Sequence, residues 1–376
     1  MRFVHMADLH IGRSLGEIDL IEDQRHALKG IVDFVGAQKP DAVLIAGDVY
    51  DKSMPSERAV ALADEFFTAL TGKCGAVCVV GGNHDSQERL SFGRRILERQ
   101  GLNIAGGYEG SLSKVDCGDA TVWLMPFFRP REASGVIGPF EPMTFDGAVR
   151  AALSRETVDP GRVNVLVTHQ FVTGVQGEAE ESESEAELTA VGGAEKVDYR
   201  AFDAFDYVAL GHLHKPQRAG REGVRYAGSL LKYSASEARH VKSVVAGEVT
   251  KDGLRVELHP VGAPRDLRVI RGTLEQLTRP ETAASRNPED YLHVTLTDPV
   301  LPPDAQARLR GLYPNIFRME YAPPEAQFRP LSARRDLSPP ELFREFFRFR
   351  TGRDLDEGMA AYMDGVLDEA RGEIAR

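Results

Sequence analysis

Short, largely apolar runs that end in polar residues recur along this chain. The runs cover residues 2–7, 42–47, 76–80, 163–168 and 206–211, and they are rich in Val, Ile and Leu. Runs of this length and composition predict buried strands in a sheet that is covered on both faces. The polar residues that follow them are Asp8, His10, Asp48, Asn83, His84, Asp85, His169, His212 and His214. Because ligands bind beyond the carboxyl ends of strands in open α/β sheets, this placement predicts a single site.

Helical periodicity separates the first predicted strands. Residues 22–38 carry one apolar face, and further helices are predicted to begin after Ser56 and after Ser86, since serine is a favoured N-cap. The helix after Ser86 is expected to carry Leu90, Ile96 and Leu97. Strands that alternate with helices over residues 1–125 indicate an α/β fold. The β-type runs within residues 221–261 are expected to complete a second sheet as antiparallel strands.

The rest of the chain predicts smaller units. Residues 260–264 read as a linker, and strands are expected at 266–271, 291–296 and 316–321, with helices between them. The predicted organisation is a main domain over 1–261, a small α+β domain over 265–325 and a C-terminal helical segment over 336–376. The acidic stretch at 176–187 is expected to be a solvated, mobile loop.

The C-terminal segment has its own helix signal. Ser338-Pro339-Pro340-Glu341 forms a capping box with proline at the first helical position. A second helical pattern follows over 355–367. The first helix carries Phe343, Phe346, Phe347 and Phe349. These rings either pack on the body of the protein or form a docking surface for a partner helix.

Composition and charge narrow the class of protein. The chain has 376 residues, with 46 Lys and Arg against 57 Asp and Glu, for a net charge of −11. This acidity weakens a nucleic-acid interpretation without excluding it, because bound divalent cations reverse the local charge at a carboxylate cluster. No apolar run approaches the ~18 residues that span a bilayer, and a strand that begins at Arg2 leaves no room for a signal peptide. With an odd number of cysteines and no motif spacing, we expect a cytoplasmic protein.

The donor types at the predicted site indicate hard or borderline divalent ions, because carboxylate, amide and imidazole groups occur without thiolate. Asp48 could bridge two cations through its two oxygens. Two ions about 4 Å apart support in-line displacement at phosphorus, so the expected reaction is phosphoester hydrolysis. His84 follows Asn83 directly and is the candidate to protonate the leaving oxygen. A carboxylate could fix its tautomer, and Asp51 is preferred over Asp85 for that role.

The ordered motifs resemble a known family. They are Ala7-Asp8-Leu9-His10-Ile11-Gly12, Gly47-Asp48-Val49-Tyr50-Asp51, Gly82-Asn83-His84-Asp85 and Gly211-His212-Leu213-His214. The set is similar to the calcineurin-type metallophosphoesterases and, among them, to the SbcD family of bacterial nuclease subunits. The resemblance implies two facing mixed β-sheets flanked by helices, a small α+β capping domain and a C-terminal helical hairpin. It also implies one ion held by Asp8, His10, Asp48 and His214, another held by Asp48, Asn83, His169 and His212, and His84 as the catalytic histidine.

The same resemblance implies a cofactor, a substrate and a partner. It indicates two divalent metal ions, Mn²⁺ with Mg²⁺ as the alternative, in a nuclease that trims duplex DNA ends and cuts hairpins and single strands. Such a nuclease would serve DNA repair, recombination and replication, and would be nucleoid-associated when bound to DNA. An SbcC-type coiled-coil ATPase would bind the terminal helices of a homodimer within a heterotetramer. Two alternatives stay open: a dimetal phosphodiesterase or phosphatase acting on nucleotides or phosphoproteins, and a non-catalytic scaffold with the phosphoesterase fold.

Overall fold

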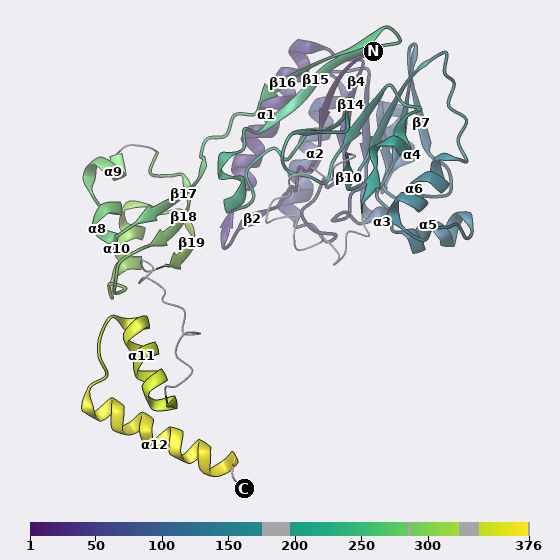
Figure 1. The fold of residues 1–376 in the computed structure, drawn as a ribbon. Helices are drawn as coiled ribbons and strands as arrows, with labels where there is room; N and C mark the ends of the chain where they lie inside the picture. The colour runs from purple at the N-terminus through teal and green to yellow at the C-terminus, as the bar shows by residue number, and fades with distance from the viewer. Residues whose placement is uncertain (175–195, 285–286, 323–337, 375–376) are drawn as a thin grey trace. The chain divides into compact units, whose positions relative to one another are not determined.

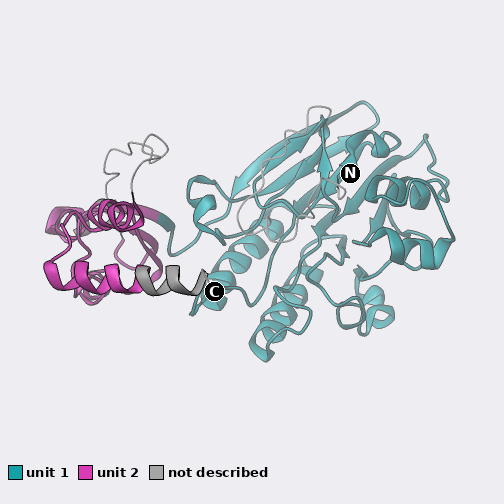
Figure 2. Cartoon of the chain, turned by 60° about the horizontal axis from the view of Figure 1, so that its bottom comes forward, with its two compact units in different colours: residues 1–268 teal, residues 269–376 magenta. Residues whose placement is uncertain are grey.

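Residues 1–174, 196–284, 287–322 and 338–374 are described by a computed structural model (Figure 1). They divide into two compact units, residues 1–268 and residues 269–376 (Figure 2). The predicted acidic loop over 176–187 lies outside the described residues. No helix among those described is long and apolar enough to cross a membrane. The three predicted domain boundaries stay predictions, and each unit is described by itself below.

Two six-stranded mixed sheets form unit 1, which confirms the fold class. The first has the order β16-β15-β1-β4-β5-β6, and its strands are β16 (Gly253–Pro260), β15 (Ser243–Thr250), β1 (Arg2–Met6), β4 (Ala42–Ala46), β5 (Ala76–Val80) and β6 (Leu102–Ala105). The second has the order β13-β14-β12-β9-β8-β7, and its strands are β13 (Gln217–Ala219), β14 (Arg221–Tyr226), β12 (Tyr207–Leu210), β9 (Val163–Thr168), β8 (Ala120–Met125) and β7 (Ser113–Cys117). In each sheet four neighbouring strands are parallel, and antiparallel strands complete it.

Alternate side chains of the central strands enter different cores. In β4, Val43 and Ile45 pack with the apolar faces of α1 (Ile21–Gln38) and α2 (Glu57–Thr71). Leu44 points the other way and packs with Val165 and Tyr207 of the second sheet. The outer face of the second sheet is covered by α5 (Pro130–Ile137) and α6 (Phe145–Leu153). The layers are therefore helix, sheet, sheet, helix, and the parallel strand ends meet where the two sheets face each other.

Two expectations about local structure are wrong. The strands β15 and β16 were expected in the second sheet, but β15 pairs with β1 of the first sheet, on the edge of β1 opposite its parallel neighbour β4, and β16 pairs with β15. The single helix expected after Ser86 is two short ones, α3 (Gln87–Leu90) and α4 (Arg94–Leu97). Gly93, with φ of 73°, interrupts it and leaves Ile96 71% exposed rather than buried. The predicted caps at Ser56 and Ser86 are confirmed.

Unit 2 contains a three-stranded sheet of order β17-β18-β19 and two terminal helices. Its strands are β17 (Leu267–Gly272, which begins at the end of unit 1), β18 (Tyr291–Leu296) and β19 (Ile316–Tyr321), and its short helices are α8 (Leu274–Leu277), α9 (Pro280–Ala284) and α10 (Ala305–Leu312). Leu274, Leu292 and Leu309 pack in one small core. The capping box at Ser338 and Glu341 is confirmed at the start of α11 (Pro339–Thr351), and α12 (Glu357–Ile374) follows.

Shorter elements complete the described chain. They are β2 (Ser14–Leu15), β3 (Ile18–Asp19), β10 (Val172–Thr173), β11 (Val197–Asp198) and three turns of 3₁₀ helix, η1 (Glu98–Gln100), η2 (Tyr199–Phe202) and η3 (Ala235–Arg239). Of these, η3 contributes directly to the site described next.

Candidate metal centre

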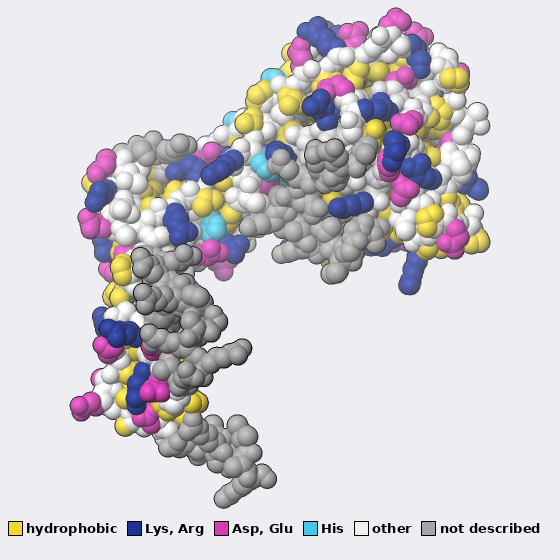
Figure 3. All heavy atoms as spheres, in the orientation of Figure 1, with side chains coloured by type: hydrophobic (Ala, Val, Ile, Leu, Met, Phe, Trp, Pro, Cys, Tyr) yellow, Lys and Arg dark blue, Asp and Glu magenta, His cyan; other side chains and the backbone are white. Residues whose placement is uncertain are grey.

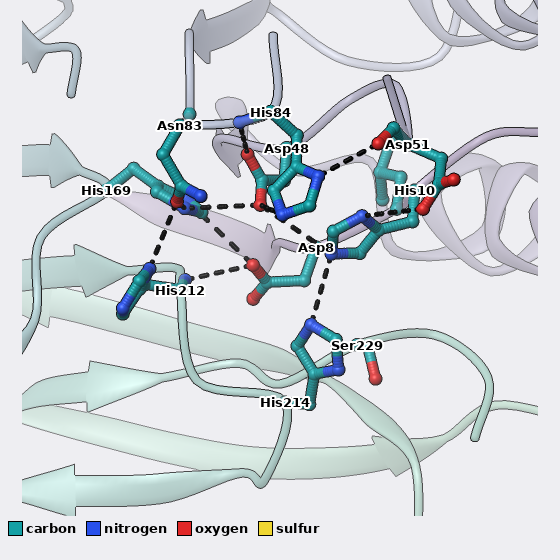
Figure 4. Close-up of polar contacts among 12 residues, drawn as sticks. Asp8, His10, Asp48, Asp51, Asn83, His84, His169, His212, His214 and Ser229 are labelled. Atoms are coloured by element: carbon teal, nitrogen blue, oxygen red, sulfur yellow. Dashed lines mark hydrogen bonds and ion pairs between the residues drawn. The ribbon is translucent and has the colours of Figure 1, made fainter. Parts of the chain in front are cut away.

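The site lies where strand ends of both sheets face each other. Backbone hydrogen bonds join the loop after β1 to the loop after β4: the amide of Asp8 donates to Gly47 O at 3.1 Å, and that of His10 donates to Asp48 O at 2.9 Å. The two sheets are joined by the amide of His212, which donates to Asp8 Oδ1 at 2.9 Å. These bonds hold residues from distant parts of the chain at one site (Figure 4).

The backbone is strained at several of these positions. Asp8, His10, Asp48 and His212 have φ values of 51°, 43°, 49° and 102°. Positive φ is unfavourable for residues with a Cβ, and such conformations cost about 1–3 kcal/mol each. Four of the five described non-glycine residues with positive φ are thus predicted metal ligands, and the fifth, Lys39, is the C-cap of α1. Strain concentrated at functional groups is typical of active sites.

Polar atoms converge in two adjacent groups. On one side, His10 Nε2 lies 3.1 Å from His214 Nε2 and 3.6 Å from Asp48 Oδ2. On the other side, Asn83 Oδ1 lies 2.9 Å from His169 Nε2 and 3.1 Å from His212 Nδ1. Asp48 Oδ2 is 3.4 Å from His169 Nε2, so its carboxylate lies between the groups. Asp8, which faces both His214 and His169, completes clusters whose donor atoms lie within 4.8 Å of one another.

The donor set fits divalent metal ions. Nitrogens about 2.1 Å from one ion and at right angles to each other are about 3 Å apart, which matches the separation of His10 Nε2 and His214 Nε2. His169 Nδ1 donates to Ala46 O at 2.8 Å, so its Nε2 atom faces the Asn83 and Asp48 oxygens and is an acceptor whenever the ring is neutral. Acceptors directed at one another need a cation between them. Asp8, His10, Asp48, Asn83, His169, His212 and His214 could hold such ions.

Burial and charge set the protonation of these groups. Burial lowers the pKa of His212 to about 3 and the pKa of His214 to about 4, so both rings are neutral near pH 7. Burial also acts to lower the pKa of His169, but the adjacent Asp48 carboxylate raises it to about 9. For Asp48, burial acts to raise the pKa, whereas His169 and His10 bring it well below its usual range. A carboxylate and neutral imidazoles are the forms that bind metals, so His169 would release a proton when an ion binds.

The structure corrects the expected support of His84. Among the described residues, no carboxylate is hydrogen-bonded to Nδ1 of its ring: His84 Nδ1 lies 2.9 Å from the backbone oxygen of Asp51 and donates to it. The Asp51 carboxylate instead accepts from Arg13 Nη1 at 2.9 Å and lies 3.5 Å from His10 Nδ1. Asp85 accepts the amides of Val49, Tyr50 and Gly82. The sequence indicated which side chains lie near His84, but not that a main-chain carbonyl would accept the hydrogen bond from its Nδ1.

His84 nevertheless faces the site. With Nδ1 held by a carbonyl, its Nε2 atom lies 3.9 Å from Asp48 Oδ2, and the side chain is 21% exposed at the edge of the cavity. Its backbone amide donates to Asp48 Oδ1 at 2.9 Å. An imidazole in this position can give a proton from Nε2 to a group that enters from solvent.

Comparison with known proteins identifies the family. Residues 1–216 match the model of the calcineurin-like phosphoesterases, and residues 263–351 match a domain described as the type 5 capsule protein repressor C-terminal domain. The chain is 32% identical over 323 residues to the SbcD subunit of the nuclease SbcCD from Staphylococcus epidermidis, covering 85% of each protein. The chain belongs to the SbcD family of calcineurin-like phosphoesterases. It is therefore a metal-dependent phosphoesterase, and divalent metals are its cofactor class.

A second SbcD relative agrees with this family. The SbcD protein of the same nuclease in Staphylococcus saprophyticus is 32% identical over 322 residues, covering 85% of this chain and 84% of that protein. A dimetal phosphatase from Danio rerio superposes with a TM-score of 0.40 at 12% identity, covering 70% of this chain and 97% of that one. Structural similarity at that level carries no argument about activity.

Sequence patterns in this SbcD-family chain missed a buried group behind the site. Glu237 and Lys242 are buried, and Lys242 Nζ donates to Glu237 Oε2 at 2.5 Å. Glu237 Oε1 is 3.3 Å from His214 Nδ1. Neither residue follows a predicted strand or belongs to a motif. No local signal marks them as buried, because polar residues such as Ser236, Arg239 and His240 lie around them in the sequence.

Two basic side chains near the site motifs, those of Arg13 and Arg89, already have partners within the protein. Arg13 bonds Asp51, and Arg89 Nη1 donates to Ser53 O at 2.9 Å. Among the coloured atoms of Figure 3, Lys and Arg side chains alternate with Asp and Glu side chains rather than gathering in one patch. The face shown therefore has no broad basic surface, in keeping with the net charge of −11.

Proposed function

We propose that this protein is a manganese-dependent DNA nuclease that cleaves phosphodiester bonds in duplex ends, hairpins and single strands. The observation that carries the proposal is the convergence of carboxylate, amide and imidazole donors on Asp48, in a chain one-third identical to proteins named as nuclease subunits. Mg²⁺ is the alternative ion, since oxygen and imidazole donors accept both. The proposed ligands are Asp8, His10, Asp48, Asn83, His169, His212 and His214.

Each residue has a distinct task in this proposal. Two bound divalent ions would polarise the phosphoryl oxygens and favour ionisation of the attacking water. Asp48 lies between the two groups and would contribute to both. His84 gives the proton from Nε2 to the leaving 3′ or 5′ oxygen, while the Asp51 carbonyl keeps its Nδ1 proton in place. Asp51 thus acts on the reaction by orienting His84 through the main chain and His10 through its carboxylate.

The direct test compares substrates. With Mn²⁺ present, the purified protein should degrade a linear duplex and nick a hairpin or single-stranded circle, whereas a cyclic nucleotide and a phosphopeptide should be poor substrates. Hydrolysis of the cyclic nucleotide alone would establish a nucleotide phosphodiesterase and end the nuclease proposal. No hydrolysis of any substrate, with both ions bound, would favour the scaffold alternative.

The terminal helices are proposed to bind an SbcC-type coiled-coil ATPase. Their exposed apolar residues support this, because Leu342, Phe346, Met359 and Tyr362 are all exposed. A helix with such a face fits the helix-in-groove mode of recognition. Deletion of residues 337–376 should abolish co-purification with that ATPase and leave ATP-independent nicking of single strands intact. Full binding by the truncated protein would contradict the docking role.

A homodimer is proposed to form through an apolar surface on unit 1. Phe92 and Ile96 are 85% and 71% exposed, and they border a hollow of about 580 Å³ that Val60 and Phe67 of α2 also line. Exposed apolar residues around one hollow are typical of an interface. The double substitution Phe92→Asp and Ile96→Lys should convert a dimer to a monomer in light scattering. Met54→Lys, at an exposed apolar residue outside the hollow lining, is the control and should leave the dimer intact.

A further inference from the structure

We infer that Glu237 and Lys242 are positioning residues for the metal ligand His214. Lys242 Nζ donates to the backbone oxygen of His214 at 2.8 Å, and Glu237 Oε1 lies 3.3 Å from Nδ1 of the same histidine. One buried ion pair therefore fixes both the main chain and the ring of one residue. The inference rests on the proposed function, since it concerns how this chain holds an ion.

The ring contact determines which nitrogen faces the metal position. Because Glu237 accepts from Nδ1, the lone pair of the neutral His214 ring is at Nε2, the atom directed toward His10. Carboxylates that accept from the far nitrogen of a histidine ligand fix its tautomer and orientation, and their loss typically weakens metal binding about 10–100-fold.

The Glu237–Lys242 pair also connects the two sheets at the site. His214 follows β12 of the second sheet, whereas Lys242 directly precedes β15, which pairs with β1 of the first sheet. His10 follows β1. The bond from Lys242 to His214 O thus ties a ligand loop of one sheet to the strand beside the other ligand loop. It fixes the distance between His10 and His214 across the cavity.

Other polar groups hold the pair itself in place. Ser234 Oγ donates to Glu237 Oε1 at 2.9 Å, and Lys242 Nζ donates to Ser229 Oγ at 2.8 Å. The Ser229 amide donates to His214 O at 3.2 Å. Figure 4 shows Ser229 beside His214. A buried ion pair costs desolvation energy, so one that is fully hydrogen-bonded behind a ligand suggests a role beyond stability.

The test measures binding of Mn²⁺ by calorimetry and by electron paramagnetic resonance on the full-length protein. Glu237→Gln should lower the affinity for one of the two ions about 10–100-fold and leave the affinity for the other near its wild-type value. Cleavage should recover at saturating Mn²⁺, because the ligands themselves remain. A purely structural role would instead lower the melting temperature in chelator without changing either affinity.

Glu156→Gln is the matched control. The Glu156 side chain is only 5% exposed, lies 3.0 Å from Lys114 Nζ and accepts the Leu112 amide, and it has no contact with the site among the described residues. Removing its charge also breaks an ion pair made by a buried carboxylate, so Glu156→Gln should change the melting temperature alone. Equal Mn²⁺ affinities in Glu237→Gln and wild type would overturn the inference.

Two further outcomes keep the test decisive. If Glu237→Gln does not fold, Ser234→Ala replaces it, because that change removes one hydrogen bond that orients the Glu237 carboxylate. A severalfold lower affinity for one ion would support the inference, and unchanged affinities would contradict it. If the wild-type protein binds no pair of ions, the proposed function fails first. Two ions in the wild type with no effect of the variants would refute only the role of the Glu237–Lys242 pair.

Discussion

His10 and His214 present their Nε2 atoms to each other at 3.1 Å, although 204 positions separate them in the sequence. Each ring has a carboxylate near its other nitrogen, Asp51 at 3.5 Å and Glu237 at 3.3 Å. Two neutral rings held in this way direct lone pairs at one another, and a cation between them turns repulsion into attraction. The folded protein should therefore be stabilised by a divalent ion.

The first prediction concerns that stabilisation. Addition of Mn²⁺ to chelator-treated protein should raise the melting temperature, by an amount equivalent to about 2.7 kcal/mol when the free ion is at 100 times its Kd. His10→Ala should reduce the shift, because one ligand is lost. The matched change His26→Ala removes a histidine of α1 that is not in the site and should leave the shift unchanged. An identical shift in His10→Ala and wild type would contradict this assignment.

The second prediction separates proton transfer from metal binding. His84→Ala should lower the rate of cleavage about 10²–10⁴-fold, as expected for loss of a general acid, while both ions still bind. Asp51→Asn should keep the His84 contact, which uses the backbone oxygen, but alter the contact with His10. Asp51→Asn should therefore change the Mn²⁺ concentration that cleavage requires more than it changes the rate of cleavage at saturating Mn²⁺. Measurements of rate against Mn²⁺ concentration distinguish the two variants, and a slow, metal-saturated Asp51→Asn enzyme would show that its carboxylate acts in the chemistry.

These residues also show how far the sequence could predict the site. Strand ends in parallel sheets are predictable, because apolar runs mark the strands and polar residues mark their carboxyl ends. Asp8, Asp48 and His169 followed that rule and lie together. The contact of His84 with a carbonyl did not follow it, because main-chain groups leave no mark in the sequence. Glu237 acts through a 3₁₀ turn with no motif, so only the folded chain brings it behind His214.

The elements of the fold also divide into those that local sequence patterns predict and those that they do not. Local patterns predicted α1, α2 and the capping box of α11, since the signal for each is contained in one turn or one helical face. The sheet that β15 would join could not be predicted, because pairing depends on which edge is free. The break between α3 and α4 depends on Gly93 adopting a left-handed conformation, which its sequence neighbours do not require.

The third prediction concerns a glycine beside the carboxylate between the two metal groups. A Cβ at Gly82 would lie 2.1 Å from Asp48 Oδ1, closer than any van der Waals contact allows. Gly82→Ala should displace Asp48 and lower the affinity for both ions. Glu237→Gln, in contrast, should lower the affinity for only one of them. Gly72→Ala, at a helix end with open space and φ of −94°, is the control and should bind metal normally. Retention of both affinities in Gly82→Ala would show that the Asp48 side chain can move without loss of binding.

The last prediction concerns stability against acid. His5 lies fully buried between the sheets, where Nδ1 is 2.9 Å from Tyr207 Oη and Nε2 is 3.1 Å from Leu210 O, and burial lowers its pKa to about 3. The unfolded value is near 6.5, so the unfolded chain binds the extra proton first. The stability that the neutral ring provides is complete above pH 6.5 and is lost as the pH falls toward 3, by at most about 1.4 kcal/mol per pH unit.

His5→Gln tests this dependence, because glutamine offers hydrogen-bonding groups that do not titrate. Other buried histidines also take up protons on unfolding, so the comparison uses the difference between the two proteins in chelator, by urea unfolding at pH 7 and pH 5. Wild type should lose about 1–2 kcal/mol more than the variant over that interval. The control is His259→Gln, which changes a histidine stacked on Phe34 in an exposed strand; it retains His5 and should lose as much stability as wild type. Parallel losses in wild type and His5→Gln would mean that His5 is protonated in the folded protein or that the sheets open around it before unfolding.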